Sequence, residues 1–186
     1  MTGLRSRLAL VVLLIALVAP AQAASVRSGR HEFALTVGYG ENHRIPTCMK
    51  ERFRFDDTTF RWGRFYSDRN EKAYELAFNN QIAGGHNQAI MAVATKRHYF
   101  AVRGNTALAY DLAFGLVRFQ DAIEGLATRV NFVEQVGLVA QYKVGPNRAL
   151  SIQYRFSHCS NGGIAKPNVG VNASSLSVGW SWFVGS

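Results

Sequence analysis

A histidine and a serine, His158 and Ser160, lie two residues apart near the end of the chain. A serine hydroxyl is a weak nucleophile until an adjacent base accepts its proton, and an imidazole is the base in many hydrolases. The preceding residues alternate between apolar and polar, which is typical of a β-strand, and residues two apart on a strand share one face. The spacing therefore predicts a serine nucleophile beside a general base. The alternating residues are Leu150, Ile152, Tyr154 and Phe156, against Ser151, Gln153, Arg155 and Ser157.

A glycine-rich turn follows the serine as Asn161-Gly162-Gly163, and a Pro-Asn pair and a second asparagine, Asn172, come after it. Backbone N–H groups just after a nucleophile can stabilise a developing oxyanion, and loss of one such donor typically costs about 10²–10³ in rate. A Ser-Asn-Gly-Gly run alone also fits an ordinary turn. The spacing of the whole stretch is more specific than the turn by itself.

The whole pattern, His-x-Ser-Asn-x-Gly and then Pro-Asn-x-Gly-x-Asn, resembles the PagL-type lipid A 3-O-deacylase family over about residues 107–184. The resemblance implies an outer-membrane barrel that removes an ester-linked acyl chain of lipid A. It implies catalytic roles for His158 and Ser160 and an oxyanion loop that uses the backbone of Asn161 and Gly163. It also implies that Asn168 shapes this loop and that Lys166 meets a phosphate of the substrate.

The group that orients His158 has two candidates in the sequence. The family carries an acid at the position of Asn172, whose amide oxygen can accept an imidazole N–H but cannot stabilise an imidazolium by charge. The second candidate is Glu134, which shares the apolar face of the preceding strand. If residues 145–147 form the hairpin loop, the register places Glu134 opposite His158. We favour Asn172 as the orienting group, with electrostatic support from Glu134, and the choice stays open at this point.

Eight segments of alternating hydrophobicity follow one another along the chain, and the sixth and seventh carry the candidate site. Eight strands, an even number, suit an antiparallel transmembrane β-barrel. The second segment changes apolar parity, which predicts a bulge near Asp56-Asp57, and the fourth has an ambiguous face. The predicted strands cover residues 33–39, 52–66, 74–78, 89–103, 108–116, 132–144, 149–160 and 176–182.

Most strands carry bulky apolar residues on one face and small or polar residues on the other, which fits lipid outside and a narrow, filled interior. A soluble lipocalin-like barrel would show the reverse arrangement, but the terminal Trp180, Trp182 and Phe183 favour the membrane form. Short links near 66–70, 104–105 and 145–147 alternate with longer ones. Because long loops of such barrels lie outside the cell, His158 and Ser160 are expected at the extracellular end, facing lipid.

The first 23 residues have the character of a secretory leader. Arg5 and Arg7 precede an apolar run over 8–19, and Ala21-Gln22-Ala23 is a small-x-small cleavage site. Cleavage would leave residues 24–186 as the outer-membrane barrel hydrolase domain. Removing two arginines and no acids lowers the formal net charge from +9 to +7. That balance favours an anionic partner such as lipopolysaccharide, and no motif indicates nucleic acid.

The remaining reactive side chains give weaker signals. The other histidines lack the spacing of metal ligands, so neither a metal nor another cofactor is expected. Cys48 and Cys159 both lie near the predicted extracellular rim of an oxidising compartment, and a disulfide between them is left open. Cys159 has inward parity, which argues against it as the nucleophile.

We therefore expect an enzyme of the cell outer membrane that hydrolyses an ester-linked acyl chain of lipid A, at the 3 position by resemblance. Its partners would be lipid A and outer-membrane lipid, and a homodimer is left open. Three alternatives also stay open. They are a catalytically inactive barrel that retains the motif, a non-enzymatic small outer-membrane barrel, and a soluble lipocalin-like binder.

Overall fold

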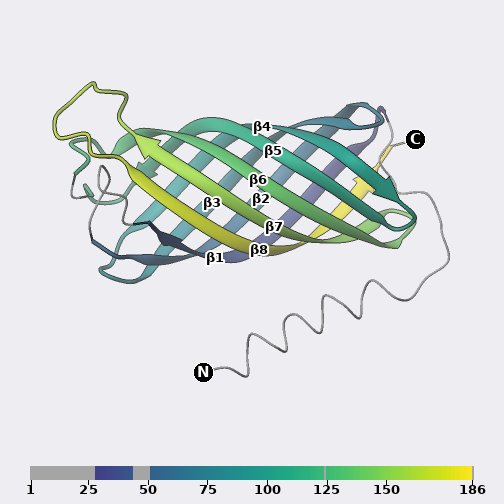
Figure 1. Ribbon diagram of the computed structural model, residues 1–186, viewed down its shortest axis with the longest axis horizontal. Coiled ribbons are helices and arrows are strands. Elements are labelled where there is room, and N and C mark those ends of the chain that lie inside the picture. The colour runs from purple at the N-terminus through teal and green to yellow at the C-terminus, as the bar shows by residue number, and fades with distance from the viewer. Residues whose placement is uncertain (1–27, 44–50, 124, 186) are drawn as a thin grey trace.

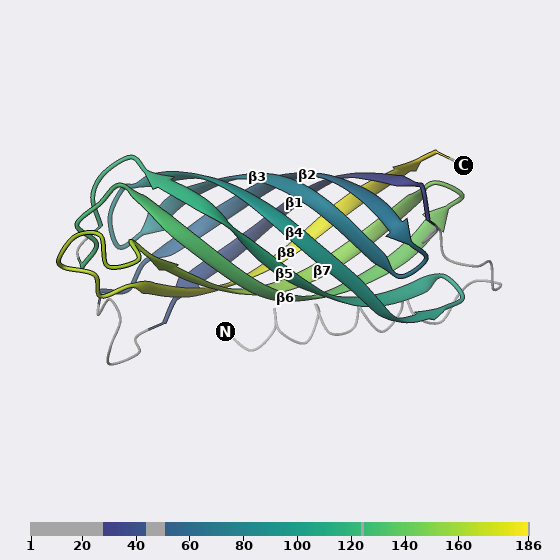
Figure 2. The ribbon, with the colours of Figure 1, turned by 90° about the horizontal axis from the view of Figure 1, so that it is seen from above.

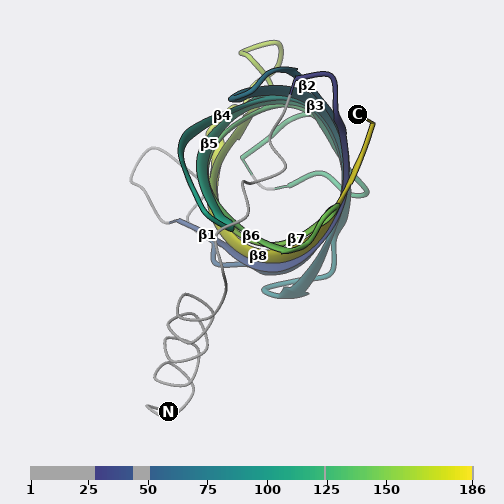
Figure 3. The same ribbon diagram turned by 90° about the vertical axis from the view of Figure 1, so that its right-hand side faces the viewer.

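The computed structural model describes residues 28–43, 51–123 and 125–185, and these residues form a closed antiparallel barrel of eight strands. Each strand pairs with the next along the chain, and β8 pairs with β1 to close the ring, as the end-on view shows (Figure 3). Figures 1 and 2 show all strands inclined to the long axis of the barrel. The strands are β1 (His31–Asn42), β2 (Arg54–Ser67), β3 (Asn70–Ala83), β4 (Gln88–Arg103), β5 (Thr106–Phe119), β6 (Val130–Gly145), β7 (Arg148–Ser160) and β8 (Val171–Val184).

The connections differ between the two ends of the barrel (Figure 1). Two-residue turns at 68–69, 104–105 and 146–147 join strands at one end, which we call the turn end. Longer links at 43–53, 84–87, 120–129 and 161–170 join strands at the other, which we call the loop end. The alternation of short and long links predicted from the sequence is confirmed. β7 therefore finishes at the loop end.

The outer surface of the barrel is apolar, and the middle of its interior is charged and polar, with an apolar cluster on either side. Large apolar side chains on the outside are about half exposed, whereas the inward residues on the same strands are buried. This arrangement fits lipid outside and is the reverse of a lipocalin-like barrel. No helix among residues 28–43, 51–123 and 125–185 is long and apolar enough to cross a membrane. The exposed residues include Phe60, Trp62, Tyr74, Phe78, Leu112, Phe114, Val136, Leu138, Leu176 and Val178.

Buried charges of both signs hold the middle of the barrel together. Arg61 of β2 contacts Glu32, Glu71 and Glu75, with distances of 3.0 Å from its Nε to Glu32 Oε2 and 2.8 Å from a terminal nitrogen to Glu71 Oε2. Arg97 donates two hydrogen bonds, of 2.7 and 2.9 Å, to the carboxylate of Asp111. Buried charges are tolerated only when they are paired and hydrogen-bonded. Each charge in this network therefore needs the strands that carry its partners to be in place.

Arg155 joins β7 to this network. Its guanidinium donates to Glu75 of β3 at 2.9 Å and to Asp111 of β5 at 3.1 Å, both across the barrel interior. An aromatic cluster of Phe65, Tyr99 and Phe183 fills the interior on the turn-end side. Cross-barrel contacts therefore restrain β7 three residues before His158.

One sequence prediction needs correction, and two others concern residues that the structure does not describe. The bulge expected at Asp56-Asp57 is absent, because β1 and β2 pair without interruption from 31–41 to 54–64. The register of β2 against β3 shifts instead between Arg54 and Phe55, and again between Phe65 and Ser67. The apparent change of parity arises because Phe55 and Phe65 point inward. The expected leader, residues 1–23, and Cys48 lie outside the described residues.

Replacing Arg61 by methionine should destabilise the barrel strongly. The change would leave Glu32, Glu71 and Glu75 without their shared cation, and removing one partner of a buried ion pair costs about 3–5 kcal/mol. We expect the variant to unfold at a lower urea concentration than the unmodified protein in detergent. Heat-modifiable migration on gels measures the folded fraction at each urea concentration. Arg64→Met is the matched control because Arg64 lies on the same strand but faces outward. Equal midpoints for the two variants would contradict a stabilising role for the network.

Candidate active site

His158 lies in a row of three polar residues that crosses three neighbouring strands. On one side it pairs with Glu134 of β6, and on the other with Asn172 of β8. The predicted pairing of Glu134 is therefore confirmed, although the turn is 146–147 and not 145–147, and a register shift between Lys143 and Gly145 restores the expected pairing. Ser160 pairs with Phe132, one row closer to the loop end. The four candidate catalytic residues thus occupy two successive rows at the loop end of the barrel.

The row faces outward, away from the charged interior. His158 and Ser160 are partly exposed, and Glu134 is exposed among the apolar residues of β6. Cys159, between the histidine and the serine, points into the barrel and is only 7% exposed. The opposite parity predicted for the cysteine is confirmed, and its thiol lies on the other side of the sheet from the imidazole.

Asn172 contacts the imidazole of His158 directly. Nδ1 of His158 lies 2.7 Å from Oδ1 of Asn172. An amide oxygen only accepts hydrogen bonds, so Nδ1 carries the proton and Nε2 presents a lone pair. Gly170, with φ of +79°, lies against the other edge of the ring, where an added Cβ would come 3.0 Å from Cε1. The ring is therefore held in the tautomer that a general base requires, with space available only because residue 170 is glycine.

Neither Ser160 nor Glu134 forms a hydrogen bond with His158 in the part of the chain that the structure describes. In structures without substrate, catalytic hydrogen bonds are often long and tighten only when substrate binds. Directly opposed residues on antiparallel strands have Cβ atoms about 4.5–5.5 Å apart, so the Glu134 carboxylate is close enough to act on the imidazole electrostatically.

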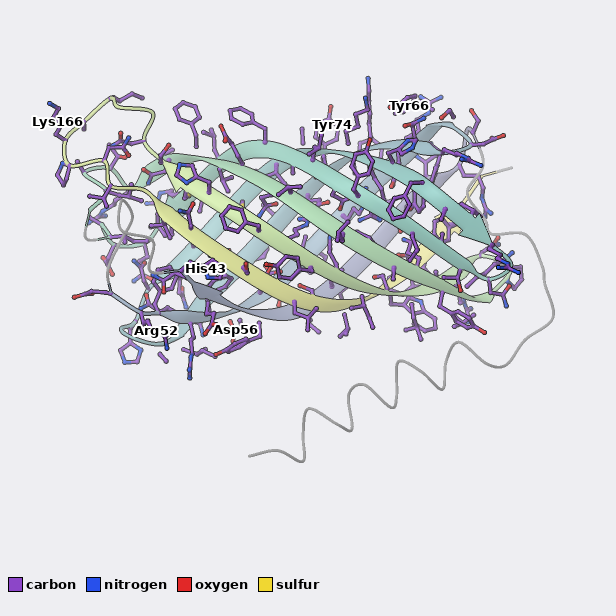
Figure 4. All side chains as sticks on the ribbon, viewed as in Figure 1. His43, Arg52, Asp56, Tyr66, Tyr74 and Lys166 are labelled. Atoms are coloured by element: carbon purple, nitrogen blue, oxygen red, sulfur yellow. The ribbon has the colours of Figure 1, made fainter. Side chains whose placement is uncertain are left out.

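The loop after Ser160 is folded on itself by asparagine side chains. The backbone N–H of Asn161 donates to Oδ1 of Asn168 at 3.0 Å, and that of Gly163 donates to Oδ1 of Asn161 at 2.9 Å. Both donors expected for an oxyanion hole are therefore engaged within the loop. Asn168 shapes the loop, as expected, while Lys166 lies exposed at its tip, at the far loop end of the barrel (Figure 4).

One polar residue near the site was missed by reasoning from the sequence. His43, just past the end of β1, lies on the outer surface, and its backbone N–H donates to the carbonyl of Asn172 at 2.7 Å. In the sequence, His43 lacks the spacing of a metal ligand, so no role was predicted for it. The sequence does indicate that Ser174, which His43 contacts, is a polar residue on the outward face of its strand.

Comparison with known proteins shows the family of this chain and agrees with its fold. The sequence model of the family described as "Lipid A 3-O-deacylase (PagL)" matches residues 49–181. The chain belongs to the PagL family. No curated protein matches the chain in sequence.

Three solved structures that are similar in fold to this PagL family member carry names that refer to a surface or an outer membrane. The crystal structure of Neisserial surface protein A has 16% identity and a TM-score of 0.66, with 83% of this chain and 97% of that chain covered. The outer membrane enzyme PagL has 16% identity and a TM-score of 0.61, with 80% and 97% covered. The outer membrane protein OprG of Pseudomonas aeruginosa has 6% identity and a TM-score of 0.53, with 86% and 99% covered. At these identities the likeness establishes the fold alone.

The contact between His158 and Asn172 predicts one tautomer of the imidazole. In ¹⁵N spectra of the detergent-folded protein, His158 should show protonated Nδ1 and unprotonated Nε2 at a pH where the ring is neutral. Asn172→Ala removes the acceptor, and we expect the Nε2-protonated form to become the major one. His158→Gln assigns the signal by its loss. Protonated Nε2 in the unmodified protein would contradict the orientation described here.

Proposed function

We propose that this chain is a lipid A deacylase that hydrolyses an ester-linked acyl chain, at the 3 position, in the outer leaflet of the outer membrane. The observation that carries the proposal is the His158–Asn172 hydrogen bond on the outer face of the loop end, beside Ser160. Polar groups on a lipid-facing surface cost free energy and usually mark function. In outer-membrane barrels the long loops are extracellular, so the site would lie at the depth of the outer leaflet.

In the proposed mechanism, Oγ of Ser160 attacks the ester carbonyl while Nε2 of His158 accepts the hydroxyl proton. The tetrahedral intermediate collapses as the imidazolium returns the proton to the departing sugar oxygen, which leaves the acyl group on Ser160. Water, deprotonated by the same imidazole, then attacks the acyl-enzyme and releases the fatty acid. No cofactor is required for these steps.

The loop from Asn161 supplies the oxyanion donors in this proposal. The N–H groups of Asn161 and Gly163 already have acceptors on Asn168 and Asn161. The substrate oxyanion would have to displace these side-chain oxygens from the two N–H groups. Because the side-chain oxygens carry negative partial charge, they occupy the positions that the oxyanion would take. Lys166, at the loop tip, would contact a phosphate of the headgroup. A pairing of two copies, left open by the sequence, gains no support from the described residues and is not part of the proposal.

One specific observation favours a second candidate, a barrel that retains the motif without activity. Asn172 stands where the family carries an acid, and an amide gives an imidazolium no charge stabilisation. The first experiment below separates the two candidates, because an inactive barrel leaves the acyl chains of lipid A intact.

Production of the chain in a Gram-negative host should remove one acyl chain from lipid A, as measured by mass spectrometry of extracted lipid. Ser160→Ala and His158→Ala should each abolish this loss, because the nucleophile or its base is removed. Cys159→Ser is the matched control and should retain most activity, since this thiol faces the barrel interior. Activity in Ser160→Ala together with a folded but inactive Cys159→Ser would overturn the assignment.

The two neighbours of His158 should differ in their effects on rate. Asn172→Ala should be the more damaging change, because loss of an orienting group in a triad costs up to about 10⁴ in rate. Glu134→Gln keeps the volume and removes only the charge, so we expect a smaller loss, and Asn172→Asp should maintain or raise the rate. Initial rates on purified lipid A in detergent measure all three. Full activity in a variant carrying both Glu134→Gln and Asn172→Ala would exclude both residues from the mechanism.

A further inference from the structure

A second group of hydrogen-bonded polar side chains lies on the outer face of the barrel. Oγ of Ser174 on β8 is 2.7 Å from Nε2 of His43 and 2.8 Å from the hydroxyl of Tyr154 on β7. The ring of His43 also stacks on Phe156, with centroids 6.0 Å apart and planes 15° from parallel. We call His43, Tyr154 and Ser174 the outer polar cluster. Figure 4 shows His43 on the outside of the barrel near its loop end.

The cluster is directly continuous with the candidate active site. Ser174 follows Asn172 by two residues on the same outward face of β8, and it pairs with Phe156 of β7. The backbone N–H of His43 donates to the carbonyl of Asn172. Two residues along a strand span about 7 Å. Ser174 is thus one outward row from His158 and Tyr154 is two, both on the turn-end side, which is deeper in the membrane if the loops are extracellular.

The chemistry of the cluster suits recognition of oxygen. A serine hydroxyl, a tyrosine hydroxyl and an imidazole face the outer surface, with apolar residues on the turn-end side and Glu41 beside Ser174 on β1. Unpartnered polar groups are costly on such a surface. Their two mutual hydrogen bonds use only part of their capacity, because each hydroxyl can donate one and accept two. A hydrocarbon chain cannot use the remaining capacity, but an oxygen on an acyl chain can.

We propose that the outer polar cluster is a substrate-binding subsite that hydrogen-bonds an oxygen substituent on the acyl portion of the glycolipid whose ester lies at Ser160. The inference rests on the proposed function and deepens it, since it assigns a preference for acyl chains that carry a hydroxyl over plain chains of equal length. Tyr154 and Ser174 contact this oxygen, and His43 acts as a positioning residue that fixes the Ser174 hydroxyl.

Two glycolipid probes test the proposal. Both are diacylated glucosamine phosphates of one chain length, one with hydroxylated and one with plain acyl chains. We expect the unmodified protein in detergent to show a kcat/KM about tenfold higher for the hydroxylated probe, as one neutral hydrogen bond allows. In Tyr154→Phe and Ser174→Ala this ratio should fall to about one, while Ser174→Thr, which keeps the hydroxyl, should preserve it.

Tyr74→Phe is the matched control. Tyr74 is another outward tyrosine, on β3, whose ring stacks on Trp62 and which lies in the turn-end half of the barrel (Figure 4). Removing the Tyr74 hydroxyl should leave the ratio of kcat/KM values for the two probes unchanged. A ratio near one in the unmodified protein, or an unchanged ratio in Tyr154→Phe, would overturn the subsite. If Ser174→Ala does not fold, Tyr154→Phe decides alone.

A binding measurement separates failure of the subsite from failure of the proposed function. Calorimetric titration of the Ser160→Ala protein with each probe gives a ratio of Kd values, which should be about tenfold and should collapse to about one when Tyr154→Phe is added. If the unmodified protein hydrolyses neither probe and this Kd pattern holds, the function is wrong and the subsite stands. If hydrolysis persists in Ser160→Ala and disappears in Ser174→Ala, Ser174 is the nucleophile and the subsite is refuted.

Discussion

Closure of the sheet is the constraint on which the remaining structure depends. In a hydrocarbon environment every backbone N–H and C=O must find a partner within the protein, and only a closed ring gives each strand two neighbours. Pairing of β8 with β1 completes that ring. Once it is complete, successive residues on each strand must alternate between lipid and interior. β7 therefore presents Arg155 and Cys159 inside and His158 and Ser160 outside, so a single strand serves both the ionic interior and the candidate active site.

The ionic interior also determines how firmly the outer row is held. Arg155 contacts Glu75 and Asp111 from strands on other sides of the ring, so β7 is restrained across the barrel and not only by its neighbours. Catalytic groups work best on rigid elements, because displacement by even about 0.5 Å from the productive geometry is costly. The outward side chains inherit this rigidity through the backbone. The lipid-facing site is thus positioned by contacts on the opposite face of the same sheet, made by residues that do not belong to the site.

Much of the fold and the register of the site could be predicted from the sequence. The period of two identifies all the strands. The three-residue loop expected at 145–147 gives the observed pairing of Glu134 with His158, but the chain reaches it through a two-residue turn and a register shift between Lys143 and Gly145. The error occurs where an inward position is aromatic, as at Phe55, because the ring occupies space left by Gly40 on the neighbouring strand, whereas the pattern assigns a large apolar side chain to lipid. The partners of the Asn161 and Gly163 N–H groups depend on how a loop closes. The contact of His43 with Ser174 joins residues 131 apart in sequence, and no local period reports it.

In the proposed mechanism, Asn172 and Glu134 share the two tasks that one acid performs in a typical triad. An acid both fixes the tautomer of the imidazole and stabilises the imidazolium. Asn172 is only 8% exposed, and a carboxylate buried there would bear a desolvation cost that a neutral amide avoids. Glu134, on the opposite side of the ring, is exposed and can keep its charge in contact with the headgroup region. In the proposed mechanism the amide sets orientation and the carboxylate supplies charge. The replacement of the family's acid by Asn172 is then compatible with catalysis because the second function lies on the neighbouring strand.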